Sequence, residues 1–351
     1  MKPTYIEIPP FRNVHGHLRE GEAIMRDLIR FSYQGGADLL GPMPNTSAGL
    51  RTAKQVVDYI NLADELGHST GHPMQFLPIG MLTESTTIAD LDAFIQAGIR
   101  NLKVYPLDRT TKSQNGVRDY NKIFDLVKYG GLHGMIFHFH PEHPLMLFEN
   151  RDAEWAFIST IDTLLRQTNA TIVWEHGTDA RNIIFWKEFA KTGRFFVTLT
   201  AHHLLLNESN SFGDVRSVCK PCIKTEVDRQ GLLALVRENH PWVMAGADDA
   251  PHPSHDKHVG HGQCACGAFT TPYMLVLYAQ ALGDLLDTED GIKTFVNFTN
   301  TNATRLHRLA PSTRMVKLVR QPQIIQLAFT VGEWNVESCM AGREIDWSLA
   351  A

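Results

Sequence analysis

Residues 101–140, NLKVYPLDRTTKSQNGVRDYNKIFDLVKYGGLHGMIFHFH, decide the fold of this chain. The stretch begins with a short apolar run at 101–105, continues through an amphipathic segment at 120–127, and ends with a second apolar run at 135–140. Short runs rich in β-branched and aromatic residues that alternate with helical segments are typical of parallel β-α-β units. The stretch therefore predicts two parallel strands joined by a helix.

The same alternation continues on both sides of this stretch. Candidate strands lie at residues 13–18, 37–43, 75–81, 101–105, 135–140, 171–176, 195–201 and 242–247. Candidate helices, with apolar positions at helical spacing, lie between them at residues 52–66, 88–97, 120–127, 153–167, 180–191 and 226–238. Eight strands with intervening helices and no internal linker predict an α/β protein that forms one (β/α)8 TIM barrel.

The barrel and the rest of the chain are expected to form one domain. Length alone does not decide this, because 351 residues can hold either one extended barrel or two to three average domains. We expect the barrel to occupy residues 1–310, with two further helices within 271–309. Residues 311–351 are expected to form a small C-terminal extension, with strand-like pieces such as 324–329, that packs on the barrel.

Composition excludes several classes of function. Hydrophobic residues make up 43% of the chain and charged residues 20%, as in an ordinary globular protein with a large core. The net charge of -5, with scattered Lys and Arg, gives no electrostatic footprint for nucleic acid. No stretch approaches the roughly 18 apolar residues that span a bilayer, and residues 1–10 lack the pattern of a secretory signal. We expect a cytoplasmic protein with no nucleic-acid or membrane partner.

The five cysteines allow two interpretations. An odd number of cysteines in a chain of this size favours reduced thiols. Cys219-x-x-Cys222 and Cys264-x-Cys266 could together form a four-thiolate zinc site, although the second spacing is shorter than in most zinc modules. The alternative is that these residues and Cys339 are small thiols in loops.

The ends of the candidate strands carry side chains suited to metal binding. In a (β/α)8 barrel the reacting groups come from the C-terminal ends of the strands and from the loops that follow them. His15 and His17 stand two residues apart on the first candidate strand, so both imidazoles can point into the barrel at one metal. Further candidates stand at or near the ends of later strands, namely Lys103, His140, His176 and Asp248. The sequence therefore predicts a ring of metal ligands at one end of the barrel.

Each member of this ring, taken alone, has another interpretation. With 17 histidines in the chain, about one H-x-H pair is expected by chance, and His138 and His140 form a second pair. A lone His140 or His176 could be a hydrogen-bonded core histidine. Asp248 could be the N-cap of a helix, and an inward Lys103 could pair with Asp248 in a barrel without metal. Their joint occurrence at strand ends favours a metal centre.

Six short motifs occur in an order that resembles the dihydroorotases of the amidohydrolase superfamily. They are His15-Gly-His17-Leu-Arg19, Met43-Pro-Asn45, Leu102-Lys-Val-Tyr-Pro106, His140-Pro-Glu142, Glu175-His176 and Asp248-Asp-Ala-Pro-His252. The similarity runs through nearly the whole chain. Thr110 and Thr111 fall in the loop after the fourth strand, where the short-chain class (class II) of the family has a paired threonine. The tail, with Met340-Ala-Gly and then Trp347-Ser, also resembles that class.

The resemblance implies two zinc ions bridged by a carboxylated Lys103. One zinc would be bound by His15, His17, Lys103 and Asp248, and the other by Lys103, His140 and His176. A lysine ammonium cannot ligate a dication, whereas its carbamate supplies two anionic oxygens that bridge metals roughly 3.5–4 Å apart.

The resemblance also implies how the substrate is bound and converted. The substrate carboxylate would be held by Arg19, Asn45 and His252, with Thr110 and Thr111 as further substrate-binding residues. A planar guanidinium suits bidentate carboxylate binding, and Asn adds an orienting donor. The implied reaction is the reversible cyclisation of N-carbamoyl-L-aspartate to L-dihydroorotate in de novo pyrimidine biosynthesis. Asp248 is the implied catalytic residue, which moves a proton from the attacking water to the departing ring nitrogen.

Several residues depart from the family's pattern. The stretch GADD at 246–249 lacks the usual threonine before and serine after the first aspartate, and Pro141 replaces a glycine. The loop between residues 252 and 269 is slightly longer, and Lys220 stands where the family has an apolar residue. These departures leave the ligand set intact and leave the identity of the cyclic amide open.

Two alternatives follow from this. The first is hydrolysis of another cyclic amide or imide, such as a hydantoin, against which Arg19 argues because it would be left as an unpaired buried cation. The second is a non-catalytic, dihydroorotase-like subunit that scaffolds a partner enzyme, against which the complete set of six ligands argues. A homodimer is expected from the family resemblance.

Overall fold

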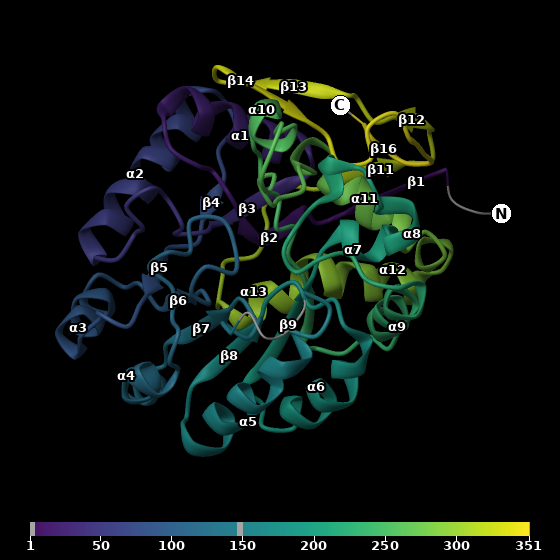
Figure 1. Cartoon of the computed structure of the whole chain (residues 1–351). Coiled ribbons are helices and arrows are strands. Elements are labelled where there is room, and N and C mark those ends of the chain that lie inside the picture. Colours follow the sequence, from purple (N-terminus) through teal and green to yellow (C-terminus); the bar gives the residue numbers. More distant parts are fainter. Residues whose placement is uncertain (1–3, 146–149, 351) are drawn as a thin grey trace.

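The computed structural model describes residues 4–145 and 150–350 and has an α/β fold in which helices surround parallel strands (Figure 1). A smaller sheet consists of β2 (Phe11–Gly16), β3 (Ala37–Pro42) and β4 (Gln75–Phe76), in that order. A larger sheet of six strands is formed by β5 (Ile79–Leu82), β6 (Asn101–Val104), β7 (Ile136–Phe139), β8 (Thr171–Trp174), β9 (Phe195–Leu199) and β10 (Val243–Ala245). Every pairing within the two sheets is parallel, and neighbours in the chain are neighbours in the sheet.

The eight predicted strands are all present, but the third is divided into β4 and β5. Pro78 stands at the break, and proline cannot donate a hydrogen bond to a strand ladder. Between β10 and β2 the described residues form no strand ladder, and the segments meet through an isolated parallel bridge of Gly16 with Asp249 and backbone hydrogen bonds from Asp248 to His15 and from His17 to Asp249. The parallel α/β class is therefore confirmed, whereas the strand ladder does not run as one continuous ring.

Helices that follow the strands along the chain lie outside them in Figure 1. They are α1 (Glu22–Gln34), α2 (Ala53–Ser69), α3 (Ile88–Gln96), α4 (Asn121–Leu132), α5 (Ile158–Gln167), α6 (Ile183–Ala190) and α9 (Glu226–Arg237). Thr52, Thr87 and Thr225 begin α2, α3 and α9 with capping boxes, which explains why these helices start where they do. The remaining α-helices of the described chain are α7 (Ala201–Leu205), α8 (Glu208–Ser211), α10 (Ser254–Lys257), α11 (Met274–Ala281), α12 (Glu289–Val296) and α13 (Asn302–Leu306).

Two apolar clusters lie on the two faces of the strands. One collects side chains from strands of both sheets, namely Val14, Leu39, Ile79, Ile136, Val173 and Met244. The larger one joins strands to helices, and there Leu102 and Val104 of β6 pack with helical residues such as Phe94 of α3. Because successive strand residues point to opposite faces, Lys103 must point away from the helices. The predicted inward direction of Lys103 is confirmed.

The C-terminal tail packs back on the body of the protein. The N-terminal strand β1 (Tyr5–Ile8) pairs antiparallel with β11 (Val316–Val319), which in turn pairs with β16 (Ser348–Leu349). Two more antiparallel pairs are β12 (Gln323–Ile324) with β15 (Glu344–Ile345), and β13 (Ala328–Val331) with β14 (Trp334–Glu337). Val331, Val336 and Trp347 are buried in the larger apolar cluster. None of the helices in the described ranges is long and apolar enough to cross a membrane.

Candidate metal centre and substrate cavity

The predicted ligands meet at the C-terminal ends of the strands. His15 stands near the end of β2, His140 directly follows β7, His176 lies two residues beyond β8, and Asp248 lies three beyond β10. Together with His17 they line one cavity. Parallel strands bring their C-terminal ends to the same edge, which explains how residues up to 233 positions apart in the chain, such as His15 and Asp248, become neighbours.

The ligating atoms of His15, His176 and Asp248 all lie within 4.8 Å of one another. The Oδ1 atom of Asp248 lies 3.1 Å from Nε2 of His15 and 3.2 Å from Nε2 of His17. The ring centroids of His140 and His176 are 4.5 Å apart. All these side chains are buried. One carboxylate and four imidazoles thus converge on a small volume, as a metal centre requires.

Lys103 is the buried cation of this centre. Its side chain is completely buried, and Nζ has no hydrogen-bond partner in the described part of the chain. It forms no salt bridge with Asp248 there, so the alternative of a lysine–aspartate pair is not what the structure contains. Burial lowers the pKa of Lys103 to about 8, an effect partly offset by Glu175 and Asp248. An appreciable fraction of this amine is therefore neutral near physiological pH.

Burial favours the neutral form of two histidines of the centre, His140 and His176, whereas the carboxylates of Glu175 and Asp248 outweigh burial and raise the pKa of His15. Burial lowers the pKa of His140, and it lowers the pKa of His176 well below the usual range. Nδ1 of His176 has no hydrogen-bond partner among the described residues. Nε2 of His140 donates a hydrogen bond to Oε2 of the buried Glu142 over 2.7 Å, which leaves Nδ1 to bind a metal. Neutral imidazoles fixed by a carboxylate are the usual metal-binding form.

Glu175 is a functional residue that sequence reasoning missed. Its carboxylate accepts hydrogen bonds from Nδ1 of His15 over 3.0 Å and from Nδ1 of His138 over 2.6 Å, and it is completely buried. It therefore orients His15 with Nε2 toward Asp248. Strict alternation would place Glu175 opposite to His176, but β8 ends at Trp174 and His176 has a φ of 40°, so alternation no longer applies. The only sequence signal was the adjacency of Glu175 to a candidate ligand.

Arg19 places a second buried cation at the wall of the cavity. The guanidinium donates to the carbonyl of Pro251 over 2.9 Å and contacts Nε2 of His252 at 3.0 Å. Within the described residues no carboxylate forms a salt bridge with Arg19, although the side chain is only 7% exposed. Burial lowers the pKa of Arg19 to about 10, and it remains charged at neutral pH. An unpaired buried cation that lines a cavity is suited to bind an anionic ligand.

The other predicted substrate-binding residues fall into two groups. Asn45, Thr110 and Thr111 line the cavity, and Oδ1 of Asn45 has no hydrogen-bond partner in the described ranges. His252 is absent from the cavity wall, and it lies beside Arg19 with Nε2 also 3.1 Å from the carbonyl of Cys266. Lys220, the departure noted in the sequence, lines the same cavity.

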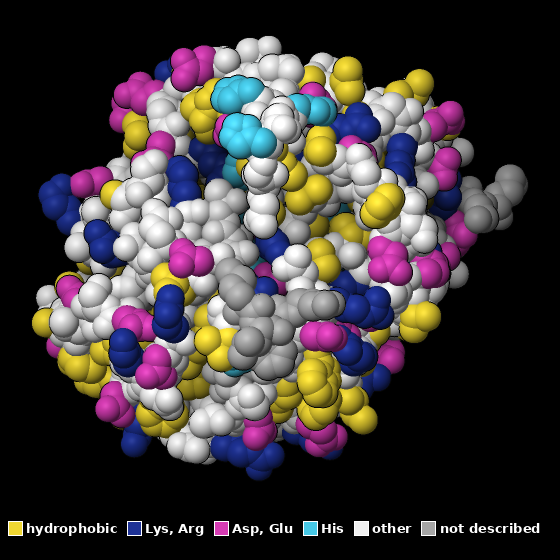
Figure 2. Space-filling view, in the orientation of Figure 1, with side chains coloured by type: hydrophobic (Ala, Val, Ile, Leu, Met, Phe, Trp, Pro, Cys, Tyr) yellow, Lys and Arg dark blue, Asp and Glu magenta, His cyan; other side chains and the backbone are white. Residues whose placement is uncertain are grey.

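The remaining histidines of residues 252–261 are solvated. His255, His258 and His261 are exposed, and histidine side chains gather on the surface over α10 in Figure 2. Asp248 does not cap this helix, because α10 begins at Ser254 and its N-cap is Pro253. The capping alternative for Asp248 is therefore wrong.

The four-thiolate zinc site is not formed. Among the described residues, the groups of metal-ligating side chains contain Cys219 with His202 and His203, and none combines Cys219 with Cys222 and the 264–266 pair. All five cysteines are free thiols.

Solved structures share the fold of this chain. The structure is similar to that of a dihydroorotase from Saccharomyces cerevisiae in complex with 5-fluoroorotic acid, with a TM-score of 0.90, 23% sequence identity and coverage of 99% of both chains. It is also similar to an L-hydantoinase from Arthrobacter aurescens, with a TM-score of 0.81, 12% identity and coverage of 98% of this chain and 82% of that one. These likenesses establish the fold.

Sequence comparison finds dihydroorotases that are similar to this chain. The chain is 28% identical over 343 residues to a dihydroorotase from Variovorax paradoxus, covering 95% of this chain and 96% of the relative. It is 29% identical over 299 residues to a probable dihydroorotase from Schizosaccharomyces pombe, covering 83% and 84%. No family model matches the chain. The chain is a relative of the dihydroorotases over nearly its whole length, and the resemblance predicted from its motifs is confirmed.

Proposed function

We propose that this protein is a metal-dependent dihydroorotase that interconverts N-carbamoyl-L-aspartate and L-dihydroorotate. The observation that carries the proposal is a pair of buried cations without anionic partners at one cavity. Lys103 is buried behind the imidazoles that line the cavity and acts electrostatically on them, and Arg19 stands in the cavity wall. A metal pair with a carbamate accounts for the first, and a substrate carboxylate accounts for the second.

The donor set fits two divalent cations. His15, His17 and Asp248 would hold one, His140 and His176 would hold the other, and Lys103 would serve both. The mixture of imidazole and carboxylate donors suits zinc. When bound, such ions lower the pKa of water and polarise the ring amide.

Lys103 enters this centre as a carbamate. Its neutral amine, favoured by burial, forms a bond from Nζ to the carbon of carbon dioxide, an electron pair of one C=O bond moves to oxygen, and the nitrogen releases one proton to water. The product carries a negative charge where an ammonium would repel the metals. The unpartnered Nζ supports this modification, because no described side chain already satisfies it.

Arg19 and Asn45 bind the substrate, and Asp248 transfers the proton in the reaction. Arg19 binds the carboxylate through its guanidinium group, and Asn45 adds its amide. Asp248, whose pKa lies well below the usual range because nearby histidines outweigh burial, is an anion at neutral pH. In ring opening, Oδ of Asp248 accepts a proton from the attacking water and returns it to the departing ring nitrogen.

The finer architecture belongs to the same proposal. We infer that the eight strands form one (β/α)8 barrel over residues 1–310, to which residues 311–351 are added within the same domain. The support is that strands of both sheets contribute to one apolar cluster, and that the Gly16–Asp249 bridge spans the gap between β2 and β10.

The decisive test measures activity and metal on one sample. Ring opening of L-dihydroorotate and of hydantoin is followed with the purified full-length protein, and zinc content is determined in parallel. We expect about two zinc ions per chain at this centre and a much higher kcat/KM for dihydroorotate. Faster turnover of hydantoin would reassign the substrate, and zinc-loaded protein inactive on both would overturn the proposal.

A further inference from the structure

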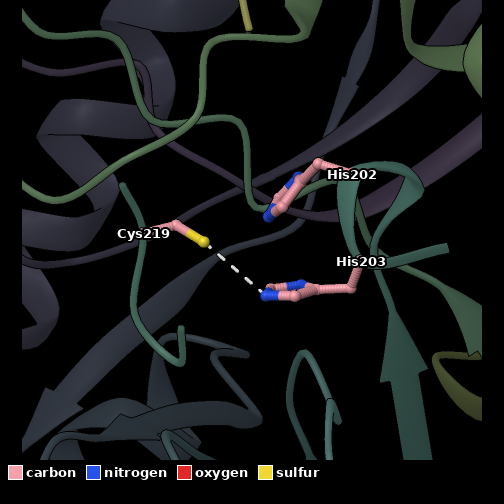
Figure 3. A group of neighbouring side chains, drawn as sticks. All are labelled: His202, His203 and Cys219. Atoms are coloured by element: carbon pink, nitrogen blue, oxygen red, sulfur yellow. Dashed lines mark hydrogen bonds between the residues drawn. The ribbon is translucent and has the colours of Figure 1, made fainter. Parts of the chain in front are cut away.

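A second buried cluster of metal-ligating side chains lies outside the centre described above. His202 and His203 come from α7, and Cys219 comes from the loop that follows a short 3-10 helix at Val215–Ser217. Figure 3 shows the three side chains pointing toward one another. Their potential ligating atoms lie within 4.8 Å of one another, and each residue is at most 4% exposed.

We propose that His202, His203 and Cys219 form a third metal site, which binds a zinc ion. Sγ of Cys219 and Nε2 of His203 are 3.6 Å apart. Zinc bond lengths of about 2.3 Å to sulfur and about 2.0–2.1 Å to nitrogen place two such ligands about 3.6 Å apart around a tetrahedral ion. The donor set of two imidazoles and one thiolate suits zinc rather than a hard cation.

His203 is already oriented for this role. Its Nδ1 is 2.7 Å from Oγ1 of Thr200, so this second contact fixes the ring and leaves Nε2 to face the cluster. The carbonyl oxygen of Pro221 lies 3.1 Å from Nε2 of His203 and 3.3 Å from Sγ of Cys219. This oxygen could be the fourth ligand of the zinc ion. Alternatively, it could accept a hydrogen bond from a water molecule that is the fourth ligand.

His202 is the independent observation that points to a ligand. Hydrogen bonds among Cys219, His203 and Pro221 could satisfy those groups without any ion. These hydrogen bonds do not involve His202. Neither of its ring nitrogens has a hydrogen-bond partner in the described structure, although the side chain is only 1% exposed. A buried imidazole without partners is unfavourable, and a metal ion in the cluster would bind one of its nitrogens.

The site would hold a loop at the substrate cavity. Lys220, which lines that cavity, directly follows Cys219, and Gly267 of the cavity wall donates a backbone hydrogen bond to the carbonyl of Val218 over 2.8 Å. A zinc ion that joins Cys219 to α7 therefore fixes this segment against the body of the protein. The expected role is structural, and it does not depend on which cyclic amide the protein converts.

Cobalt spectroscopy tests the site without reference to activity. The full-length protein is stripped with a chelator and titrated with Co2+ under reducing conditions. Thiolate-to-cobalt charge transfer absorbs strongly in the near ultraviolet, and the first centre cannot produce it because its ligands are nitrogen and oxygen. We expect this absorption in the wild type and in Cys222→Ser, which removes a thiol of the same loop outside the cluster, and we expect its loss in Cys219→Ser.

Metal stoichiometry gives the second readout. Zinc-saturated wild type should hold one more zinc per chain than Cys219→Ser, and His202→Ala should bind that zinc at least tenfold more weakly. The proposal is overturned if the wild type shows no thiolate charge transfer at saturating cobalt, or if Cys219→Ser keeps the full absorption. The wild-type measurement alone is decisive should a variant fail to fold. Failure of the proposed dihydroorotase activity would leave these results unchanged.

Discussion

Two completely buried cations, Arg12 and Lys103, stand on strands of the same barrel-like assembly and are treated in opposite ways. Arg12 lies near the N-terminal end of β2. Its guanidinium donates to Oε1 of Gln75 and to the carbonyl of Ala310, both over 2.9 Å, and Nε lies 3.2 Å from Oδ1 of Asp38. Lys103 lies near the C-terminal end of β6, where Nζ has no hydrogen-bond partner among the described residues and lies 5.3 Å from the centroid of the Tyr105 ring.

The difference separates a structural end of the strands from a chemical one. A buried charge is costly unless it is paired and hydrogen-bonded. At the N-terminal end the chain supplies those partners itself, so Arg12 needs nothing more. At the C-terminal end we propose that the partners of Lys103 come from outside the chain, as carbon dioxide and metal ions. Substitutions at the two ends should therefore affect different measurements.

The largest effect is expected from Lys103→Ala. Without the bridging carbamate the two metal positions lose their shared ligand, so zinc content and ring-opening activity should fall together, the latter by at least about a thousandfold. Short carboxylic acids that fill the vacated space should restore part of both. The measurements are zinc per chain and kcat with and without added acid. A variant with both metals and activity within tenfold of wild type would contradict the bridge.

Asp248→Asn should separate metal binding from catalysis. Most of the ligand set survives, so substantial zinc should remain, but an amide cannot accept and return the proton. We expect kcat to fall by about 10²–10⁴. Retention of zinc with kcat within tenfold of wild type would show that Asp248 does not carry the proton.

Arg19→Ala should weaken the binding of carboxylate-bearing substrates. Loss of a buried charged contact costs about 2–4 kcal/mol, so kcat/KM for dihydroorotate should fall by roughly 30- to 1000-fold. Zinc content should not change, because Arg19 lies in the cavity wall. Any residual hydantoin turnover serves as the control, since that substrate lacks the carboxylate. Unchanged KM and kcat would make Arg19 a structural residue like Arg12.

Arg12→Met should lower stability and leave metal binding and activity unchanged, the opposite of what is expected for Lys103→Ala. The substitution keeps most of the side-chain volume but leaves Asp38 and Gln75 without their buried partner, so the free energy of unfolding should fall by about 2–4 kcal/mol. Zinc content and kcat of the folded protein should remain as in the wild type. Denaturant unfolding with parallel kinetics checks both statements, and a loss of metal at unchanged stability would break the comparison between the two ends.

Features that follow from local sequence patterns could be predicted. The eight strands follow from short apolar runs that alternate with helical segments, whereas the inward direction of Lys103 and the His15–His17 pair follow from period-two alternation within a regular strand. The break at Pro78 follows a proline that was visible in the sequence but was not weighed against the apolar run around it.

Other features depend on chain paths that no local pattern encodes. Glu175 can accept a hydrogen bond from His15 because β8 ends at Trp174, one residue before it. Arg12 donates a hydrogen bond to the carbonyl of Ala310, which lies near the other end of the sequence. His202, His203 and Cys219 meet because the intervening loop folds back on α7, a long-range effect without a spacing signature.

The smallest effect is expected from Glu84→Gln. This substitution tests whether a charged residue at the C-terminal end of the strands, when the chain supplies its partners, contributes to stability and not to catalysis. Glu84 follows β5, accepts backbone hydrogen bonds from Arg118 and Asp119 over 2.8 and 2.9 Å, and pairs with Lys122. The Lys122 side chain, with those N–H groups, lowers the pKa of Glu84 from 4.5 to about 2. Because the folded-state pKa is depressed, the carboxylate stabilises the protein above about pH 4.5, and this contribution is lost as pH falls through 2. After solvent screening we expect this carboxylate to contribute about 1 kcal/mol to the free energy of unfolding.

The free energies of unfolding of the variant and the wild type should thus differ by that amount at pH 7 and converge toward pH 2, with kcat unchanged at pH 7. A difference that persists undiminished in acid would mean that the ionised carboxylate is not what stabilises the loop.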